Sequence, residues 1–220
     1  RGSDPSEPDE RQADTARAAM IRVLLAEDQA MVRGALAALL TLEGDIEVVA
    51  EVARGDEVLA AALKVRPDIV LLDIEMPGQN GLSVLSELRE KLPAARTLIL
   101  TTFGRPGYLR KAMENGAAGF LLKDAPSRDL AIAIRRAISG ERVVDPGLAA
   151  TALSEGPSPL TDREQEVLSI ARTTSTIAEI ADRLYLSEGT VRNYLSTAIH
   201  KLGAQNRIEA TRIAEQKGWL

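Results

Sequence analysis

Acidic side chains end two apolar runs in the first half of the chain. Glu27 and Asp28 follow Ile21–Ala26, and Asp73 follows Ile69–Leu72. Apolar runs without polar alternation are typical of strands covered on both faces, and open parallel sheets place their chemistry at the carboxyl ends of such strands. Three carboxylates gathered there would repel one another unless a hard divalent cation such as Mg2+ lay among them. Taken alone, Asp73 fits equally well as a turn residue that ends a strand.

A hydroxyl and a cation end two later apolar runs. One run ends on Thr101-Thr102, and the next ends on Lys123. If these runs are strands of the same sheet, Lys123 can pair with Asp73 or with a phosphoryl group on it, and the hydroxyls can donate hydrogen bonds at the same edge. An acid pair, a single acid, a hydroxyl and a lysine in this order form a more specific signal than any one of them.

Five strand–helix units are predicted to position these residues. Each helix closes near Gly or Pro and the connections are short, which predicts an α/β domain with a parallel sheet and right-handed crossovers. The flavodoxin-like strand order 2-1-3-4-5 is expected, and it makes the first and third strands neighbours. The expected strand and helix of each unit are 21–26 with 31–40, 46–52 with 57–65, 69–73 with 82–92, 97–102 with 108–115, and 119–123 with 130–139.

The composition is that of an ordinary globular protein and excludes several classes. The 220 residues include no cysteine, which excludes a disulfide scaffold and thiol chemistry. His200 is the one histidine, so a Ser/His triad and a histidine-rich metal site are excluded. No apolar run approaches the roughly 20 residues of a membrane-spanning helix, so a cytoplasmic protein is expected. Residues 1–19 are polar and aperiodic, which predicts a disordered tail that begins with a tag remnant.

A second, smaller domain of four helices is expected after the first. We place the α/β domain at 20–143, a linker at 144–159 and the helical domain at 160–220. The linker carries Asp145-Pro-Gly and Gly156-Pro-Ser-Pro, with space for a helical turn or two between them. Thr161 and Glu164 predict a capping box at the start of the helical domain. Its helices are expected at 164–172, 177–184, 188–202 and 207–218.

The second and third of these helices have the spacing of a helix-turn-helix, with Ser187 capping the later helix. The inward face of that helix is expected to be Val191, Leu195, Ala198 and Leu202. Its outward face is Arg192, Asn193, Ser196 and His200, a composition suited to reading a DNA groove. A plain helical bundle with a solvated polar face is the alternative.

The charge balance bears on that choice. A formal net charge of -5 argues weakly against nucleic acid as a partner. Residues 160–220, however, carry eight Lys+Arg and eight Asp+Glu, so the acid excess lies upstream. A DNA contact would therefore depend on the placement of a few cations.

The first domain resembles the receiver domain of bacterial two-component response regulators, from Met20 to about Arg142. By this resemblance Asp73 is the phospho-acceptor. Asp28 binds Mg2+ directly and Glu27 binds it through water, while the backbone carbonyl of Glu75 is a further ligand. Mg2+ is thus the implied cofactor.

The resemblance also implies a switch. Thr101 is the switch hydroxyl, Phe120 the switch aromatic, and Lys123 the partner of the phosphoryl group. Movement of the loops toward that group is expected to rebuild the face around the helix 108–115. Many receivers have Pro directly after the lysine, whereas Asp124-Ala125-Pro126 follows here, which puts the geometry of that loop in doubt.

The second domain resembles the LuxR-type effector domain, so the whole chain resembles the NarL/FixJ class of response regulators. The resemblance is carried by Leu160-Thr-Asp-Arg-Glu-Gln-Glu-Val-Leu, Ile177-Ala-Glu-Ile-Ala, Leu186-Ser-Glu-Gly-Thr-Val-Arg-Asn-Tyr and Lys201-Leu-Gly. The DNA contacts that it implies are Thr190, Arg192, Asn193, Ser196 and Lys201. Family members commonly have Lys in place of Arg192 and His in place of Tyr194. The segment 100–108 further resembles regulators of the membrane-lipid desaturase type.

These resemblances imply a phosphorylation-controlled transcription regulator and no enzyme beyond phosphoryl turnover at Asp73. The expected partners are a sensor histidine kinase, double-stranded DNA and, when the chain is phosphorylated, a second copy; no membrane is involved. Two other classes stay open. One is a Mg2+-dependent phosphohydrolase that forms an aspartyl-phosphate on Asp73, and the other is a phosphorelay protein whose helical tail binds protein. The last helix, with Trp219, either pairs two copies or anchors the core.

Overall fold

The computed structural model describes residues 20–102, 104–124, 127–174 and 176–220. They form two compact units, one of residues 20–102 together with 112–144, and one of residues 104–111 together with 145–220. Within these described ranges no helix is long and apolar enough to span a membrane. The expected tail at 1–19 and the Ala125-Pro126 step after the lysine lie outside the described residues.

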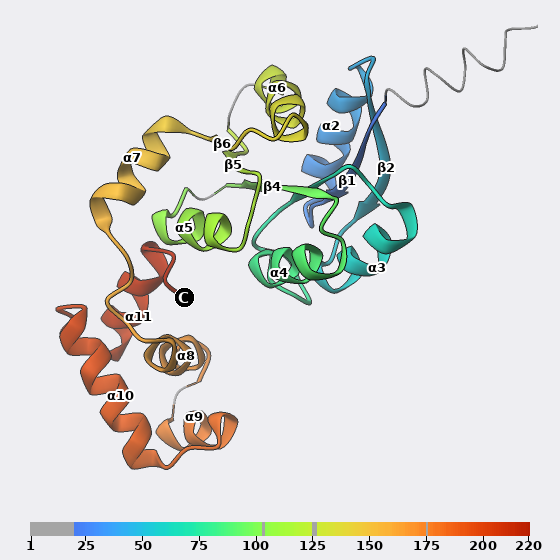
Figure 1. Cartoon of the computed structure of the whole chain (residues 1–220). Helices are drawn as coiled ribbons and strands as arrows, with labels where there is room; N and C mark the ends of the chain where they lie inside the picture. Colours follow the sequence, from blue (N-terminus) through green and yellow to red (C-terminus); the bar gives the residue numbers. More distant parts are fainter. Residues whose placement is uncertain (1–19, 103, 125–126, 175) are drawn as a thin grey trace, which may run out of the picture. The chain divides into compact units, whose positions relative to one another are not determined.

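The first unit is built on a six-stranded parallel sheet (Figure 1). The strand order is β2-β1-β3-β4-β5-β6, which confirms the predicted order 2-1-3-4-5 and adds one short edge strand. All four residues of β3 are fully buried, as its unbroken apolar run predicts. The strands are β1 Ile21–Ala26, β2 Ile46–Val52, β3 Ile69–Leu72, β4 Arg96–Thr101, β5 Gly119–Leu122 and β6 Val143–Val144.

Helices cover both faces of this sheet (Figure 1). On one face α2 (Ala30–Thr41) and α6 (Ser127–Ile138) pack on the core that contains Val23, Leu71 and Leu98. On the other face lie α3 (Gly55–Val65) and α4 (Gly81–Lys91), which pack against each other. In open sheets covered in this way, ligands bind outside the carboxyl ends of the strands, so these ends are the expected place for a functional site.

The second unit consists of five helices and the first turns of α5 (Pro106–Glu114). The helices are α7 Pro146–Glu155, α8 Asp162–Ala171, α9 Ile177–Leu184, α10 Glu188–Lys201 and α11 Arg207–Gln216. The segment predicted as a linker contains the whole of α7, which is longer than the one or two turns expected. Asp145 caps it by accepting a hydrogen bond of 2.8 Å from the backbone N–H of Leu148, so the Asp-Pro-Gly sequence starts a helix there.

The helix-turn-helix of α9 and α10 has the predicted core. Val191, Leu195 and Ala198 are buried and Leu202 is half-buried, all within one apolar cluster. The capping box at Thr161 and Glu164 is present. Trp219 is half-buried against the same cluster, which agrees with a core anchor.

Backbone and side-chain contacts tie the beginning of α5 to the chain's last residues within the second unit. The backbone N–H of Gly107 donates to the carbonyl of Lys217 at 2.9 Å. Nζ of Lys111 donates to the carbonyl of Trp219, also at 2.9 Å. Tyr108, in the segment expected to offer a docking face, is buried.

Candidate functional site

The register of neighbouring strands brings the predicted acids together. Ala26 of β1 is opposite Leu72 of β3, so the residues that follow them leave the sheet side by side. The backbone N–H of Asp73 donates to the carbonyl of Ala26 at 3.0 Å. Each of Glu27, Asp28 and Asp73 offers a carboxylate oxygen, and these oxygens lie within 4.8 Å of one another.

Lys123 lies among these acids as predicted. Its Nζ is 2.8 Å from Oδ2 of Asp73 and 2.5 Å from Oε2 of Glu27. The lysine reaches this position because β5 pairs with β4 and the backbone N–H of Lys123 donates to the carbonyl of Thr101 at 2.9 Å. The other oxygen of Asp73, Oδ1, accepts a hydrogen bond of 2.7 Å from the backbone N–H of Ile74. One carboxylate is therefore fixed by a cation on one oxygen and by an amide on the other.

Burial and charge act against each other in this cluster. Burial raises the pKa of Glu27, and the neighbouring Lys123 reduces this effect without reversing it. Burial alone would lower the pKa of Lys123, but hydrogen bonds to Asp73 and Glu27 outweigh it and raise that pKa above its ordinary value. The lysine thus stays a cation, while the cluster still holds more acids than bases.

Asp28 carries the evidence that the cluster suits a metal ion. Its Oδ1 is buried. Among the buried side-chain nitrogen and oxygen atoms of the described residues, it is the one without a hydrogen-bond partner. A buried carboxylate oxygen without a partner is unfavourable, so such an atom needs an explanation. Three clustered carboxylates are the oxygen donors that Mg2+ prefers, and a cation there would supply the missing partner. The residues present therefore fit Mg2+.

The loop after β3 is held close to the site by Gly81. A Cβ on Gly81 would lie 2.1 Å from the carbonyl oxygen of Asp73, so a larger residue would displace the acceptor. Glu75, whose backbone carbonyl is the predicted further metal ligand, lies in this loop with its side chain exposed. The role of that carbonyl stays a prediction.

The predicted switch residues lie on adjacent strands inside the first unit. Thr101 ends β4 and is opposite Leu122 of β5, while Phe120 of β5 is opposite Ile99. Both Thr101 and Phe120 are buried. The sheet therefore brings the hydroxyl to the strand end that also presents Asp73 and Lys123, and their roles in switching stay predictions.

The second candidate surface is the exposed face of α10. Arg192, Asn193 and Ser196 are exposed there, and Thr190 is half-buried, with its hydroxyl oxygen 2.8 Å from that of Ser187. Arg192 is engaged within the helix because its Nη2 donates to Oε2 of Glu188 at 2.5 Å. Glu188 was not among the predicted site residues, although its i,i+4 spacing to Arg192 in the sequence indicates such a pair.

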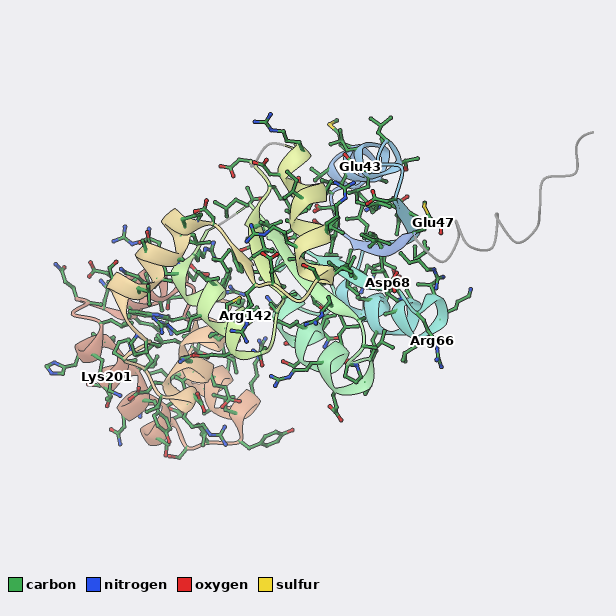
Figure 2. The ribbon with its side chains drawn as sticks, turned by 45° about the horizontal axis from the view of Figure 1, so that its top comes forward. Glu43, Glu47, Arg66, Asp68, Arg142 and Lys201 are labelled. Carbon is green, nitrogen blue, oxygen red and sulfur yellow. The ribbon has the colours of Figure 1, made fainter. Side chains whose placement is uncertain are left out.

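Lys201 has a structural partner that the sequence analysis did not foresee. At the end of α10 (Figure 2), its Nζ donates to both carboxylate oxygens of Glu164, at 2.9 and 2.7 Å. Burial alone would raise the pKa of Glu164, but hydrogen bonds from Lys201 and from the backbone N–H of Thr161 lower it below the ordinary value. Lys201 thus ties the end of α10 to the beginning of α8. Its predicted contact with DNA stays a prediction.

Two families match the chain, one for each part. The family described as the response regulator receiver domain matches residues 23–135, and the luxR family of bacterial regulatory proteins matches residues 158–214.

Known relatives share both parts. The transcriptional regulatory proteins YvfU and DesR of Bacillus subtilis (strain 168) are 50% and 46% identical to this chain over 201 residues, which are 91% of this chain and all of each relative. The response regulator ChrA of a heme-sensing two-component system has a crystal structure that is 34% identical, with a TM-score of 0.54, and it covers 92% of this chain and all of that one. The RcsB–DNA complex, at 22% identity and a TM-score of 0.63, shares the fold over 90% of this chain and 98% of its own.

Proposed function

Because this chain belongs to the NarL/FixJ family of two-component response regulators, which join a receiver domain to a LuxR-type DNA-binding domain, we propose that a phosphoryl group on Asp73 controls its regulation of transcription. The donor is a phosphohistidine of a sensor kinase in the cytoplasm. The observation that carries the proposal is the placement of Asp73 between the cation Lys123 and a partnerless buried oxygen of Asp28.

Phosphoryl transfer needs positioning and charge compensation more than it needs a strong base. An oxygen of Asp73 forms the new bond to phosphorus while the bond between phosphorus and the kinase's imidazole nitrogen breaks. Glu27, Asp28 and Asp73, with the backbone carbonyl of Glu75, would hold Mg2+, which supplies charge neutralisation for the phosphoryl oxygens. Lys123, already 2.8 Å from Asp73, stabilises the negative charge on those oxygens.

The product changes the charge at the strand ends and thereby acts as a switch. A phosphoryl group on Asp73 offers new acceptors to Lys123 and to the hydroxyl of Thr101. Phe120, packed two residues behind the strand end, is the side chain that responds to a shift of Thr101. Hydrolysis of the same acyl phosphate by water returns the chain to its first state, so the chain turns over its own phosphoryl group without acting as an enzyme on other substrates.

The DNA-binding part of the proposal assigns α10 to the major groove. Arg192 and Asn193 reach base edges, with Thr190 and Ser196 beside them. Arginine at position 192 can bond a guanine through two donors, which a lysine there could not do. Two copies of the chain would then bind paired half-sites about one helical turn apart.

The apolar surface of α2 supports a dimer of the first unit. Met31 of α2 and Leu42, which caps the end of this helix, are 88% and 82% exposed, and Leu39 is exposed as well. Arg33, the one charged residue of Ala30–Thr41, turns back so that its Nη1 donates to the carbonyl of Glu27 at 2.6 Å. A cavity of about 360 Å³ opens between α2 and α6, and most of its lining is apolar. Exposed apolar surface of this kind marks an interaction site.

A further feature favours a second copy as the occupant of this surface. A Cβ added to Gly34, in the middle of α2, would meet nothing within 4 Å, so packing within the chain does not require a glycine there. Glycine nevertheless weakens a helix interior. With Ala35 and Ala38 it forms a strip of small exposed residues against which the same helix of a second copy can pack closely, as a two-fold axis requires.

The decisive experiment follows phosphate and DNA in the same samples. Wild-type chain and Asp73→Asn are incubated with Mg2+ and labelled acetyl phosphate, then assayed for label and for DNA binding. We expect the wild type to take up label and to bind DNA at least ten times more tightly when labelled, and Asp73→Asn to do neither. Fast multiple turnover of small phosphates would instead favour the phosphohydrolase. Label uptake without any DNA affinity would favour the phosphorelay protein.

A further inference from the structure

Tyr185 joins α9 to α10 in a backbone conformation that tyrosine rarely adopts. Its φ is 55° and its ψ is 43°, in the left-handed region, and its backbone N–H donates to the carbonyls of Ala181 and Asp182 and so ends α9. A bulky side chain in this region is crowded by its own backbone. The helix-turn-helix therefore bears a conformational cost at this residue.

Several other helices are followed by a glycine with a positive φ. Positive φ angles are found at Gly116 after α5, Gly140 after α6, Gly203 after α10 and Gly218 after α11. Arg66, which ends α3 (Figure 2), is another residue other than glycine with a positive φ, and its carbonyl accepts a hydrogen bond of 3.2 Å from Arg22. A glycine would serve equally well after α9, so ending that helix does not explain a tyrosine.

Packing within the chain does not explain the tyrosine either. Its side chain is 96% exposed, whereas the next residue, Leu186, is partly buried in the core of the helical unit. A residue that keeps a strained backbone conformation while its side chain is fully exposed to solvent is expected to contact another molecule. Tyrosine also loses little side-chain entropy on contact, because it has only two side-chain torsions.

The position of Tyr185 indicates which partner it meets. Ser187, two residues later, caps α10, and the exposed residues Glu188 and Gly189 follow it. In helix-turn-helix proteins the beginning of the second helix enters the major groove and the first helix crosses the sugar–phosphate backbone. The turn between the two helices therefore lies over that backbone, where tyrosine hydroxyls commonly donate to phosphate oxygens.

We infer that Tyr185 contacts the sugar–phosphate backbone beside the groove that α10 reads, with its hydroxyl donating to a phosphate oxygen. The inference rests on the proposed DNA binding. Such a contact positions α10 without reading sequence. Because tyrosine is uncharged, it displaces no counterion, so the contact adds affinity without adding salt dependence.

Tyr185→Gly tests this inference with two readouts that move in opposite directions. The probes are a duplex selected from a random pool by the phosphorylated wild type and a non-specific duplex of the same length, each measured at several salt concentrations. We expect binding about ten times weaker on both duplexes with an unchanged slope of affinity against salt. The melting temperature of the full-length chain without DNA is expected to rise by about 1–4 °C, because glycine removes the strain.

Two further variants make the test specific. Tyr185→Phe keeps the ring and loses only the hydroxyl, so we expect binding about two to five times weaker on both duplexes. Arg66→Gly relieves a left-handed residue far from the helix-turn-helix sequence, and we expect it to leave the affinity for DNA unchanged.

Equal DNA affinity of wild type and Tyr185→Gly would overturn the inference. A loss confined to the selected duplex would also overturn it, because that outcome indicates base reading. If the wild type bound neither duplex, the proposed DNA binding itself would fail, and the two failures are therefore distinct.

Discussion

Lys123 donates a hydrogen bond of 2.8 Å to Oδ2 of Asp73, the residue proposed to accept the phosphoryl group. The same ammonium lies 2.5 Å from Glu27, so one cation serves two acids that leave neighbouring strands. A phosphoryl group on Asp73 would compete with Glu27 for this cation. Phosphorylation of Asp73 would therefore change the position of Lys123, which directly follows β5.

Replacing this lysine should slow phosphorylation without abolishing the acceptor. In Lys123→Gln the charge that develops on the phosphoryl oxygens loses its cation, so we expect label uptake from acetyl phosphate to fall by about 10²-fold. Label is measured over time at a fixed Mg2+ concentration. Lys64→Gln, which removes a lysine from the last turn of α3, is the matched control and should behave as the wild type. An unchanged rate in Lys123→Gln would remove the lysine from the mechanism.

Asp28 should show its role in the response of stability to Mg2+. We expect Mg2+ to stabilise the first unit of the wild type by about 1–3 kcal/mol when it is well above the dissociation constant. Asp28→Asn should lose this response and be no less stable than the wild type without metal, because it removes a buried charged oxygen that has no partner. Thermal melts with and without Mg2+ measure both effects.

The control for the metal experiment is Glu90→Gln, at an exposed position of α4. It makes a similar loss of negative charge away from the cluster. Equal loss of the Mg2+ response in the two variants would show that Asp28 is not a ligand.

Glu188 should restrain the binding of DNA by Arg192. Because its carboxylate holds the Arg192 guanidinium and repels phosphates, Glu188→Gln is expected to tighten binding about two- to tenfold on any duplex. Fluorescence anisotropy on selected and non-specific duplexes measures the change. Glu166→Gln breaks an exposed pair with Arg163 on α8 and gives the same change in net charge. If both variants tightened binding equally, the effect would be one of net charge alone.

The Glu164–Lys201 pair makes a pH dependence testable. The pKa of Glu164 is lowered in the folded chain, so the carboxylate contributes stability above its unfolded pKa of about 4.3, and this contribution is lost as pH falls through the lower folded pKa. At pH 7 we expect Glu164→Gln to cost about 1–3 kcal/mol, because Lys201 and the capping box lose a charged acceptor. Denaturant titrations should show this difference shrinking below about pH 4. A difference that stayed constant with pH would contradict the assignment.

The exposed face of α2 should control self-association. We expect Met31→Glu to weaken the phosphorylated dimer by at least about tenfold, since it buries a charge in an apolar contact. Leu63→Glu, at an exposed leucine of α3 on the other face of the sheet, should have little effect. Sedimentation velocity on labelled samples measures both. The chain has no cysteine, so Ala38→Cys also permits disulfide cross-linking between copies, with Leu63→Cys as the control. Equal behaviour of the α2 and α3 variants would place the contact elsewhere.

The sheet and its site were largely predictable because both follow from local patterns. The unbroken apolar runs gave the strands, and the strand order then brought Glu27, Asp28, Asp73 and Lys123 to one edge, as the distances confirm. The helix-turn-helix core could be predicted for the same reason, since Val191 and Leu195 follow the helical period.

The features that local sequence patterns did not predict depend on contacts between distant residues or on backbone angles. Glu164 and Lys201 are 37 residues apart, and no local pattern indicates that they meet. The left-handed conformation of Tyr185 contradicts the preference of its residue type, so propensity could not reveal it. Helix α7 was underestimated because Pro146 and Gly147 suggested a linker, whereas Asp145 and Pro146 in fact begin a helix.

Helix α2 begins at Ala30, two residues after Asp28, so the element that carries the exposed apolar face starts next to two of the proposed metal ligands. If occupancy of that face favours the phosphorylated state, thermodynamic reciprocity requires that the phosphoryl group favour occupancy by the same factor. At equilibrium with the phosphodonor, a larger fraction of the chain would then be phosphorylated where the chain is more abundant, so the strength of the response would depend on how much of the regulator has accumulated.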